Sequence, residues 1–427
     1  MWPGLADKHQ WPWGITVNST RQLPLRGVMR LRSVFCLMLI LVGVAAQAGP
    51  REQALQIHNR IAGVPPSESV LLQMADLIAE GDVDAAVELA MDNEHFYSVT
   101  LKNMATPWTN RDQSVFAPLN DYTATFIGMV RDGEDIRGLL YDNVLYVGSA
   151  SGLPAYANDD NQHYEALETQ GLPLGDPEVL VKRTQSDVNG LPAEATAGVM
   201  TSRAAARAFF YAGTNRAMFR FTLLNHLCRD LEQVHDTSLT PDRIRQDVSR
   251  SPGGDSRVFL NNCMGCHNGM DPLAQAYAYY NWDYDADADP EGEDGRLTYN
   301  REGETEAETG TRVVPKYHIN ANTFRYGYVT MDDQWDNYWR EGNNRVLGWS
   351  DALPGSGEGA KSMGMELAHS EAFASCQVEK VFRQVCLRQP GSPEDHQLIE
   401  TATDHLANAG FDLRRAFIDT ADYCKGE

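Results

Sequence analysis

Apolar residues recur at intervals of three and four along much of this chain, which is the spacing of one face of an α-helix. A clear example lies between Pro65-Pro66 and Gly81, residue types that are common at helix boundaries. The apolar positions between them are Val70, Leu71, Met74, Leu77 and Ile78. Asp82 follows directly and can cap the next helix. The pattern therefore predicts two consecutive helices here.

The same helical pattern continues toward the C-terminus. Leu224, Leu227, Cys228 and Leu231 share one face of a predicted helix. Thr240-Pro241 and Ser392-Pro393 each place a capping side chain before a proline, which predicts helices from Pro241 and from Pro393, the second running towards Gly410. Helices are also predicted for SEAFASCQVEKVFRQVCLR (370–388) and DLRRAFIDTADYC (412–424). Alternating runs such as NVLYVGSA are short and few, so we expect a mainly α protein with long loops.

Residues 29–48 have the pattern of a secretory signal peptide. Arg30 and Arg32 precede an apolar run from Val34 to Ala46, and the segment ends in an A-x-A cleavage site. The run is shorter than the roughly 20 residues that cross a bilayer. We therefore expect an exported, periplasmic protein whose mature chain has no transmembrane segment. Residues 1–28 show no helical or strand period and are interpreted as a non-native N-terminal extension.

The charge of the chain limits its partners. The 427 residues carry a formal net charge of -23, and 42% of them are hydrophobic, enough for a folded protein with sizeable cores. Binding to nucleic acid or to anionic lipid depends on clustered Lys and Arg side chains, which this composition does not favour. A basic protein is the surface partner that the charge favours.

Export changes how the seven cysteines are interpreted, because cysteines tend to pair in an oxidising compartment. Outside the predicted signal and the CxxC segment at 263–266, the cysteines are Cys228, Cys376, Cys386 and Cys424. Cys376 and Cys386 lie ten residues apart on a predicted helix, about 15 Å, whereas disulfide Cα atoms lie within about 7 Å. Each should therefore pair with Cys228 or Cys424, and we favour Cys386 with Cys424. Four reduced, buried thiols are the alternative.

The strongest chemical signal is CMGCHNGMD, residues 263–271. A CxxCH sequence fits covalent haem c, because each thiol can form a thioether with a porphyrin vinyl group and the adjacent imidazole can bind the iron. We expect one haem, attached through Cys263 and Cys266, with His267 as the proximal ligand. Asp255 or Ser256 caps a short apolar turn that ends at Cys263, which places the motif at a helix end. The Pro- and Gly-containing stretch 249–256 suggests a domain boundary.

Two other cofactors or reactions fit this cysteine pair less well. A structural zinc site needs four ligands, and no second pair stands at a matching spacing. A thioredoxin-type dithiol belongs in a βαβ setting, which the helical context does not offer. A single CxxCH also gives no support to a dihaem peroxidase.

The sixth ligand of the iron stays open at this stage. Met270 is too close to His267 in sequence to reach the opposite haem face. Met331 follows an aromatic-rich loop, Met363 lies just before a predicted helix, and His318 is a third candidate. Methionine would raise the reduction potential relative to a second histidine, and an open site would permit a small ligand to bind.

An acidic run follows the motif. Asp287, Asp289 and Glu291 match positions 1, 3 and 5 of a calcium loop, and Gly292 matches position 6. The match then fails, because position 12 is Thr298 where a bidentate Glu is required. We interpret the run mainly as a solvated acidic insertion that could steer a basic redox partner.

Three stretches carry a family resemblance: AGVMTSRAAARAFFYAGTNRAMFRFTLLNHLCRDLE, CMGCHNGMDPLAQAYAYYNW and SEAFASCQVEKVFRQVCLR. Over about half of the chain, the sequence resembles exported bacterial cytochrome c-domain proteins of unassigned function, of the type abundant in planctomycetes, in which CxxCH is followed by Asp-Pro. The resemblance implies haem at Cys263, Cys266 and His267 and a redox role outside the cytoplasm. The acidic insertion and the cysteines outside the motif depart from the family, so its partners do not transfer.

We expect a helical region of unknown role over residues 49–250, followed by a cytochrome c-like helical haem domain with long loops over residues 251–427. The expected function is a periplasmic monohaem c-type cytochrome that carries single electrons between partners, so an electron carrier more than an enzyme. The alternatives are a haem enzyme or sensor with an open distal site, and a binding or scaffold module in which the haem is structural.

Overall fold

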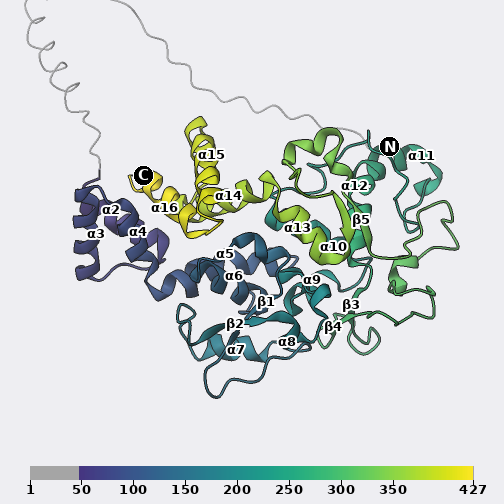
Figure 1. Ribbon diagram of the computed structural model, residues 1–427, viewed down its shortest axis with the longest axis horizontal. Helices are drawn as coiled ribbons and strands as arrows, with labels where there is room; N and C mark the ends of the chain where they lie inside the picture. Colours follow the sequence, from purple (N-terminus) through teal and green to yellow (C-terminus); the bar gives the residue numbers. More distant parts are fainter. Residues whose placement is uncertain (1–47, 427) are drawn as a thin grey trace, which may run out of the picture. The chain divides into compact units, whose positions relative to one another are not determined.

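Helices dominate the computed structural model, which describes residues 48–426 (Figure 1). The α-helices are α2 (Pro50–Ile61), α3 (Glu68–Glu80), α4 (Val83–Met91), α5 (Lys102–Ala105), α6 (Asp121–Arg131), α7 (Gln162–Thr169), α8 (Gln185–Asn189), α9 (Arg203–Phe209), α10 (Arg216–His226), α11 (Ser256–Val258), α12 (Met264–Ala274), α13 (Gly359–Ala368), α14 (Glu371–Cys386), α15 (Pro393–Asn408) and α16 (Arg414–Cys424). The predicted mainly α class is thus confirmed.

Strands form three small antiparallel pairs. Their bounds are β1 (Val144–Gly148) with β2 (Leu180–Thr184), β3 (Tyr280–Asp283) with β4 (Arg296–Tyr299), and β5 (Gln334–Asp336) with β6 (Ser356–Glu358). In the first pair Tyr146 lies opposite Lys182, and in the second Trp282 lies opposite Leu297. The acidic run 283–294 joins β3 to β4, so it is a hairpin connection.

Local capping explains where several helices begin and end. The Ser67 side chain accepts a hydrogen bond from the Val70 amide at the start of α3, and Gly81 ends this helix in a left-handed conformation. Asp82 caps α4 by accepting from the Ala85 amide, as predicted. At the start of α15, Ser392 and Asp395 form a capping box with Pro393 in the first turn. These predicted helices are confirmed. Their capping residues lie within a few positions of the helix ends, so a local sequence pattern is enough to locate them.

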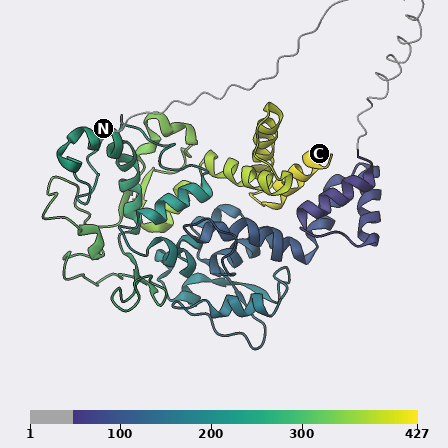
Figure 2. The ribbon, with the colours of Figure 1, turned by 180° about the vertical axis from the view of Figure 1, so that it is seen from behind.

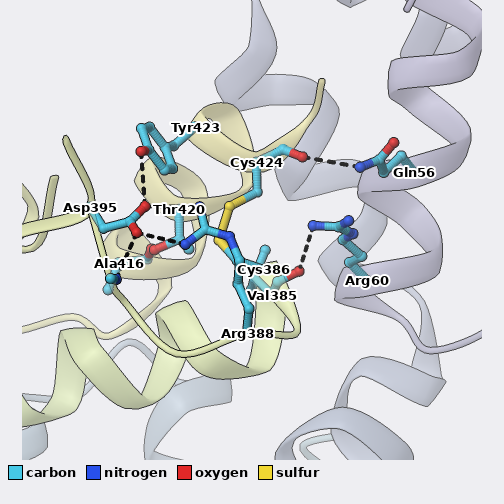
Figure 3. The surroundings of a disulfide bond; sticks show 11 residues. Gln56, Arg60, Val385, Cys386, Arg388, Asp395, Ala416, Thr420, Tyr423 and Cys424 are labelled. Carbon is cyan, nitrogen blue, oxygen red and sulfur yellow. Dashed lines mark hydrogen bonds and ion pairs between the residues drawn. A yellow bond between two sulfur atoms is a disulfide. The ribbon is translucent and has the colours of Figure 1, made fainter. Parts of the chain in front are cut away.

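The N-terminal and C-terminal helices lie side by side. In both ribbon views, α2 and α4 are next to α16, and α14 and α15 pack on α16 (Figure 1, Figure 2). Gln56 Nε2 donates to the Cys424 carbonyl at 3.1 Å, and Arg60 Nη1 donates to the Val385 carbonyl at 3.2 Å (Figure 3). Arg415 of α16 also pairs with Asp84 of α4 at 2.7 Å. The largest hydrophobic cluster has members from Ala54 to Ala421 and so on both sides of residue 250.

Of the two disulfide pairings that helix geometry left open, the structure has the one that we favoured. Cys386 is bonded to Cys424, and Cys228 is bonded to Cys376. Cys376 and Cys386 both lie on α14, so the exclusion of a bond between them is confirmed, and the alternative of four reduced thiols is wrong. Two disulfides are consistent with an oxidising compartment outside the cytoplasm.

Two helix predictions are wrong, and tertiary contacts explain both. Helix α10 ends at His226, short of the predicted Leu231, because Cys228 adopts a left-handed backbone (φ 53°) where its disulfide joins α14. No helix begins at Pro241. The backbone amides after Pro241 make tertiary hydrogen bonds in place of helical ones. The Gln246 amide donates to the Tyr328 carbonyl at 3.1 Å, and the Arg245 amide donates to the carboxylate of Asp271 at 3.1 Å.

The predicted N-terminal extension 1–28 and signal 29–48 lie outside the described residues, apart from Ala48. Within residues 48–426, none of the helices combines the length and the apolar character that crossing a bilayer requires.

The two disulfides should contribute unequally to stability. Cys228 and Cys376 are 148 residues apart in sequence, and Cys386 and Cys424 are 38 apart. The loop-entropy model gives about 5 kcal/mol for the first loop and about 4 kcal/mol for the second. We expect the Cys228→Ser, Cys376→Ser variant to lose roughly 1 kcal/mol more than the Cys386→Ser, Cys424→Ser variant in urea unfolding. An equal or reversed loss would contradict this.

Asp395 should stabilise the C-terminal helices in a pH-dependent manner. It accepts hydrogen bonds from Arg388 at 2.6 and 2.8 Å and from the Tyr423 hydroxyl at 2.9 Å (Figure 3), and chiefly the Arg388 bond lowers its pKa. A lowered folded-state pKa stabilises the fold above the unfolded value of about 4, and this contribution is lost as the pH falls below it.

We therefore expect Asp395→Asn to lose roughly 1–3 kcal/mol at pH 7. The difference from the unsubstituted protein should shrink below about pH 4 in thermal or urea unfolding followed by circular dichroism. A difference that stays constant from pH 7 to pH 3 would exclude the assignment.

Candidate functional site

The CMGCHNGMD segment lies within a continuous helical stretch. Helix α11 leads into a π-helical turn, Phe259–Cys263, and α12 follows directly. The expectation that the motif sits at a helix end is therefore wrong, because helix continues through Cys263 to Ala274. Cys263, Cys266 and His267 stand at positions i, i+3 and i+4, which share one face of a helix.

The two motif cysteines differ from the other four cysteines of the described chain. Cys263 and Cys266 are free thiols, each partly buried, whereas the others are disulfide-bonded. The Cys266 thiol donates to the Leu231 carbonyl at 3.4 Å. Burial raises the pKa of Cys266, and the nearby carboxylates of Glu232 and Asp230 raise it further. This thiol is thus held in its neutral form at neutral pH.

His267 is oriented by a carboxylate one turn further along α12. Its Nδ1 lies 3.1 Å from Oδ1 of Asp271, and the side chain is partly exposed. An ionised carboxylate only accepts hydrogen bonds, so Nδ1 carries the proton and donates it. In the neutral ring this leaves Nε2 with a free lone pair, and no residue of the described chain is hydrogen bonded to Nε2.

Asp271 itself is fully buried in an ion-pair network. Arg216, the first residue of α10, donates Nε to Oδ1 at 2.6 Å and Nη2 to Oδ2 at 2.8 Å. Arg216 also pairs with Asp247, and the Arg245 amide donates to Oδ2 of Asp271. The charge of Arg216 and its hydrogen bonds outweigh burial and hold the pKa of Asp271 well below its usual value.

Two glycines of α12 allow other side chains to approach the helix closely. A β-carbon on Gly265 would lie 2.2 Å from Nε2 of His235, and one on Gly269 would lie 1.9 Å from Nε1 of Trp339. The Asp236 amide also donates to the Gly265 carbonyl at 2.9 Å. The loop after α10 therefore packs on the CxxCH turn.

The structure separates the candidates for a sixth ligand. Met331 is 52% exposed, whereas Met363 is 0% exposed and belongs to the large hydrophobic cluster. His318 uses Nε2 in a 2.6 Å hydrogen bond with the Thr330 carbonyl. Met331 follows a segment that is tied to the motif's surroundings, because Tyr328 pairs with the backbone on both sides of Arg245.

The acidic run is held by its own turns and by Arg207 and Tyr211, which contact Glu293 and the Pro290 carbonyl. Oδ1 of Asp285 accepts from the Asp287 amide at 3.0 Å, and Oδ2 of Asp289 accepts from the Asp294 amide at 2.8 Å. The partial calcium-loop match from Asp287 to Thr298 ends inside β4. Residues 48–426 contain no group of three or more His, Cys, Asp or Glu side chains placed to hold a metal ion.

The described chain has two hollows of about 650 and 660 Å³, and the second reaches Leu239, whose carbonyl accepts a hydrogen bond from Asn268 of the motif. The first is lined by β1, β2 and the loop after β1, and the second by the segments around Leu239 and Tyr338. Neither is lined by Cys263, Cys266 or His267. A molecule held by these three residues would therefore lie against the partly exposed face of α12.

Sequence analysis alone assigned no role to Asp271, Arg216, Arg245 or His235. The i+4 spacing from His267 could have indicated Asp271, since both were expected near one helix. Arg216 is 55 residues from Asp271 in sequence, and no local pattern relates the two.

Comparison with known proteins adds no relative: no family model, no curated protein and no solved structure matches this chain.

Proposed function

We propose that this protein is an exported monohaem c-type cytochrome that carries single electrons between redox partners. One observation carries the proposal: two free thiols and an imidazole share one helical face in CxxCH order, while the other four cysteines of residues 48–426 are disulfide-bonded. Thiols left free beside disulfides are suited to a covalent partner other than a cysteine.

The residues of this site fit a haem in three respects. Cys263 and Cys266 would form the two thioethers, and His267 would bind the iron through Nε2, the ring atom without a partner in the described chain. Asp271 fixes the ring tautomer that this binding requires. The haem, when bound, supplies a metal that changes between the ferric and ferrous states by one electron.

The protein then takes one electron from a reduced donor and passes the same electron to an oxidised acceptor, with no bond made or broken. The net charge of -23 favours a basic partner at the docking surface. The two disulfides support a location outside the cytoplasm, as does the signal peptide predicted from the sequence.

For the sixth ligand we favour Met331 over Met363. The exposed Met331 side chain can turn toward a haem that lies against α12, whereas Met363 would have to leave a packed core. The segment before Met331 pairs through Tyr328 with residues 244 and 246, which flank Arg245, and the Arg245 amide donates to Asp271.

Two alternative functions rest on other features of the protein. Partial exposure of the motif face is compatible with an iron open to a small ligand, as in a haem enzyme or sensor. The long helical region before residue 250 could instead bind a partner while the haem plays a structural role. A haem enzyme or sensor predicts a spectrum that changes with a small ligand. A binding module with a structural haem predicts no reversible electrochemistry near physiological potentials.

Covalent attachment can be tested in a host that assembles c-type cytochromes. We expect the protein to keep haem stain on a denaturing gel and the Cys263→Ser, Cys266→Ser variant to lose it completely, because thioethers need both sulfurs. The matched control is Cys386→Ser, Cys424→Ser, which removes two sulfurs elsewhere and should keep the stain. A colourless unsubstituted protein, or stain retained without Cys263 and Cys266, would refute the proposal.

The sixth ligand can be tested with volume-conserving substitutions. We expect carbon monoxide to leave the spectrum of the reduced protein unchanged and to shift that of Met331→Leu, because leucine has the size but not the sulfur of methionine. Met363→Leu is the control and should behave like the unsubstituted protein. If the unsubstituted protein already shifts with carbon monoxide, the iron is open and the enzyme or sensor function is favoured.

A further inference from the structure

We propose that Asp271 is a positioning residue for His267: its buried carboxylate accepts the Nδ1 hydrogen bond and increases the electron density of the imidazole, so that the reduction potential of the site is lowered. This inference rests on the proposed function, because it concerns the strength of His267 as an iron ligand. It adds a determinant of the potential that lies outside the CxxCH residues.

The hydrogen bonds of Asp271 hold both of its oxygens. Oδ1 accepts from Arg216 Nε and His267 Nδ1, and Oδ2 accepts from Arg216 Nη2 and the Arg245 amide, at 2.6 to 3.1 Å. Four donors fill the four lone-pair positions of a carboxylate. The group can therefore neither rotate nor take up a proton without the loss of a buried hydrogen bond.

The network joins three separate parts of the fold. Arg216 begins α10, Asp271 lies on α12, and Arg245 belongs to the loop segment between these helices. Asp247 pairs with the other edge of Arg216, and His267 is hydrogen bonded to Asp271 and not to Asp247. The position of Asp271 is thus fixed by tertiary structure, and the imidazole must adapt to it.

A carboxylate acts differently from a neutral acceptor at this place. A ligating histidine that donates its second N–H to a carboxylate becomes a more basic ligand. A more basic ligand stabilises the ferric state, which has the higher positive charge, more than the ferrous state. The potential therefore falls, and the protein is biased toward giving up its electron.

The test compares the midpoint potentials of variants that still attach haem. Asp271→Asn removes the negative charge and keeps an amide of the same shape. We expect its midpoint potential to rise by the equivalent of at least a tenfold change in the electron-transfer equilibrium, which is 59 mV for one electron. Asp247→Asn is the matched control, because it removes a carboxylate from the same Arg216 without touching His267, and should shift the potential far less.

Asp271→Asn leaves Arg216 without its Asp271 carboxylate partner, and the loss of this pair can prevent folding. A second variant tests the inference in that case. The double variant Arg216→Met, Asp271→Asn removes both buried charges, an exchange that proteins often tolerate. It leaves the net charge unchanged, so a rise in its potential reports the exchange of a carboxylate for a neutral acceptor at His267 Nδ1 and not a change in the net charge of the protein.

The outcomes separate this inference from the proposed function. Absence of covalent haem from the unsubstituted protein defeats the proposed function. Normal haem stain in the Asp271 variants, with a potential that moves no more than in Asp247→Asn, overturns the role of Asp271 and leaves the cytochrome assignment standing.

Discussion

The buried ion pair between Arg216 and Asp271 is the interaction on which the candidate site depends. It joins α10 to α12, anchors the intervening loop through the Arg245 amide, and sets the ring of His267. A buried carboxylate is stable only when its hydrogen-bonding positions are filled, so each partner constrains the others. The same contacts that fold this region therefore hold the imidazole in one orientation.

The cysteines of the described chain fall into two groups, four that form disulfides and two with free thiols. The Cys386–Cys424 bond links α14 to α16, against which the N-terminal helices pack, and the Cys228–Cys376 bond joins the end of α10 to α14. Cys263, at the end of the π-helical turn, and Cys266, on α12, stay free. The disulfides thus stabilise the framework, while the two free sulfurs remain available for attachment chemistry.

Charge serves two separate roles. The buried charges near α12 are paired and oriented, and they act on His267 at hydrogen-bond distance. The acidic run between β3 and β4 is mostly exposed, although Glu293 pairs with Arg207. Exposed charges act over about a Debye length and suit the attraction of a partner more than the tuning of a site.

The sequence by itself determined the helices whose signals are local, such as α3 and α15, and the CxxCH order of the thiols and the imidazole. It also excluded a bond between Cys376 and Cys386, because a helix separates them by a known distance, and the tertiary structure decided between the two pairings that were left. Only the tertiary structure decided that α10 stops before Cys228, that no helix follows Thr240, and that Arg216 and Arg245 meet Asp271. Those outcomes depend on residues distant in sequence, and a local pattern contains no information about such contacts.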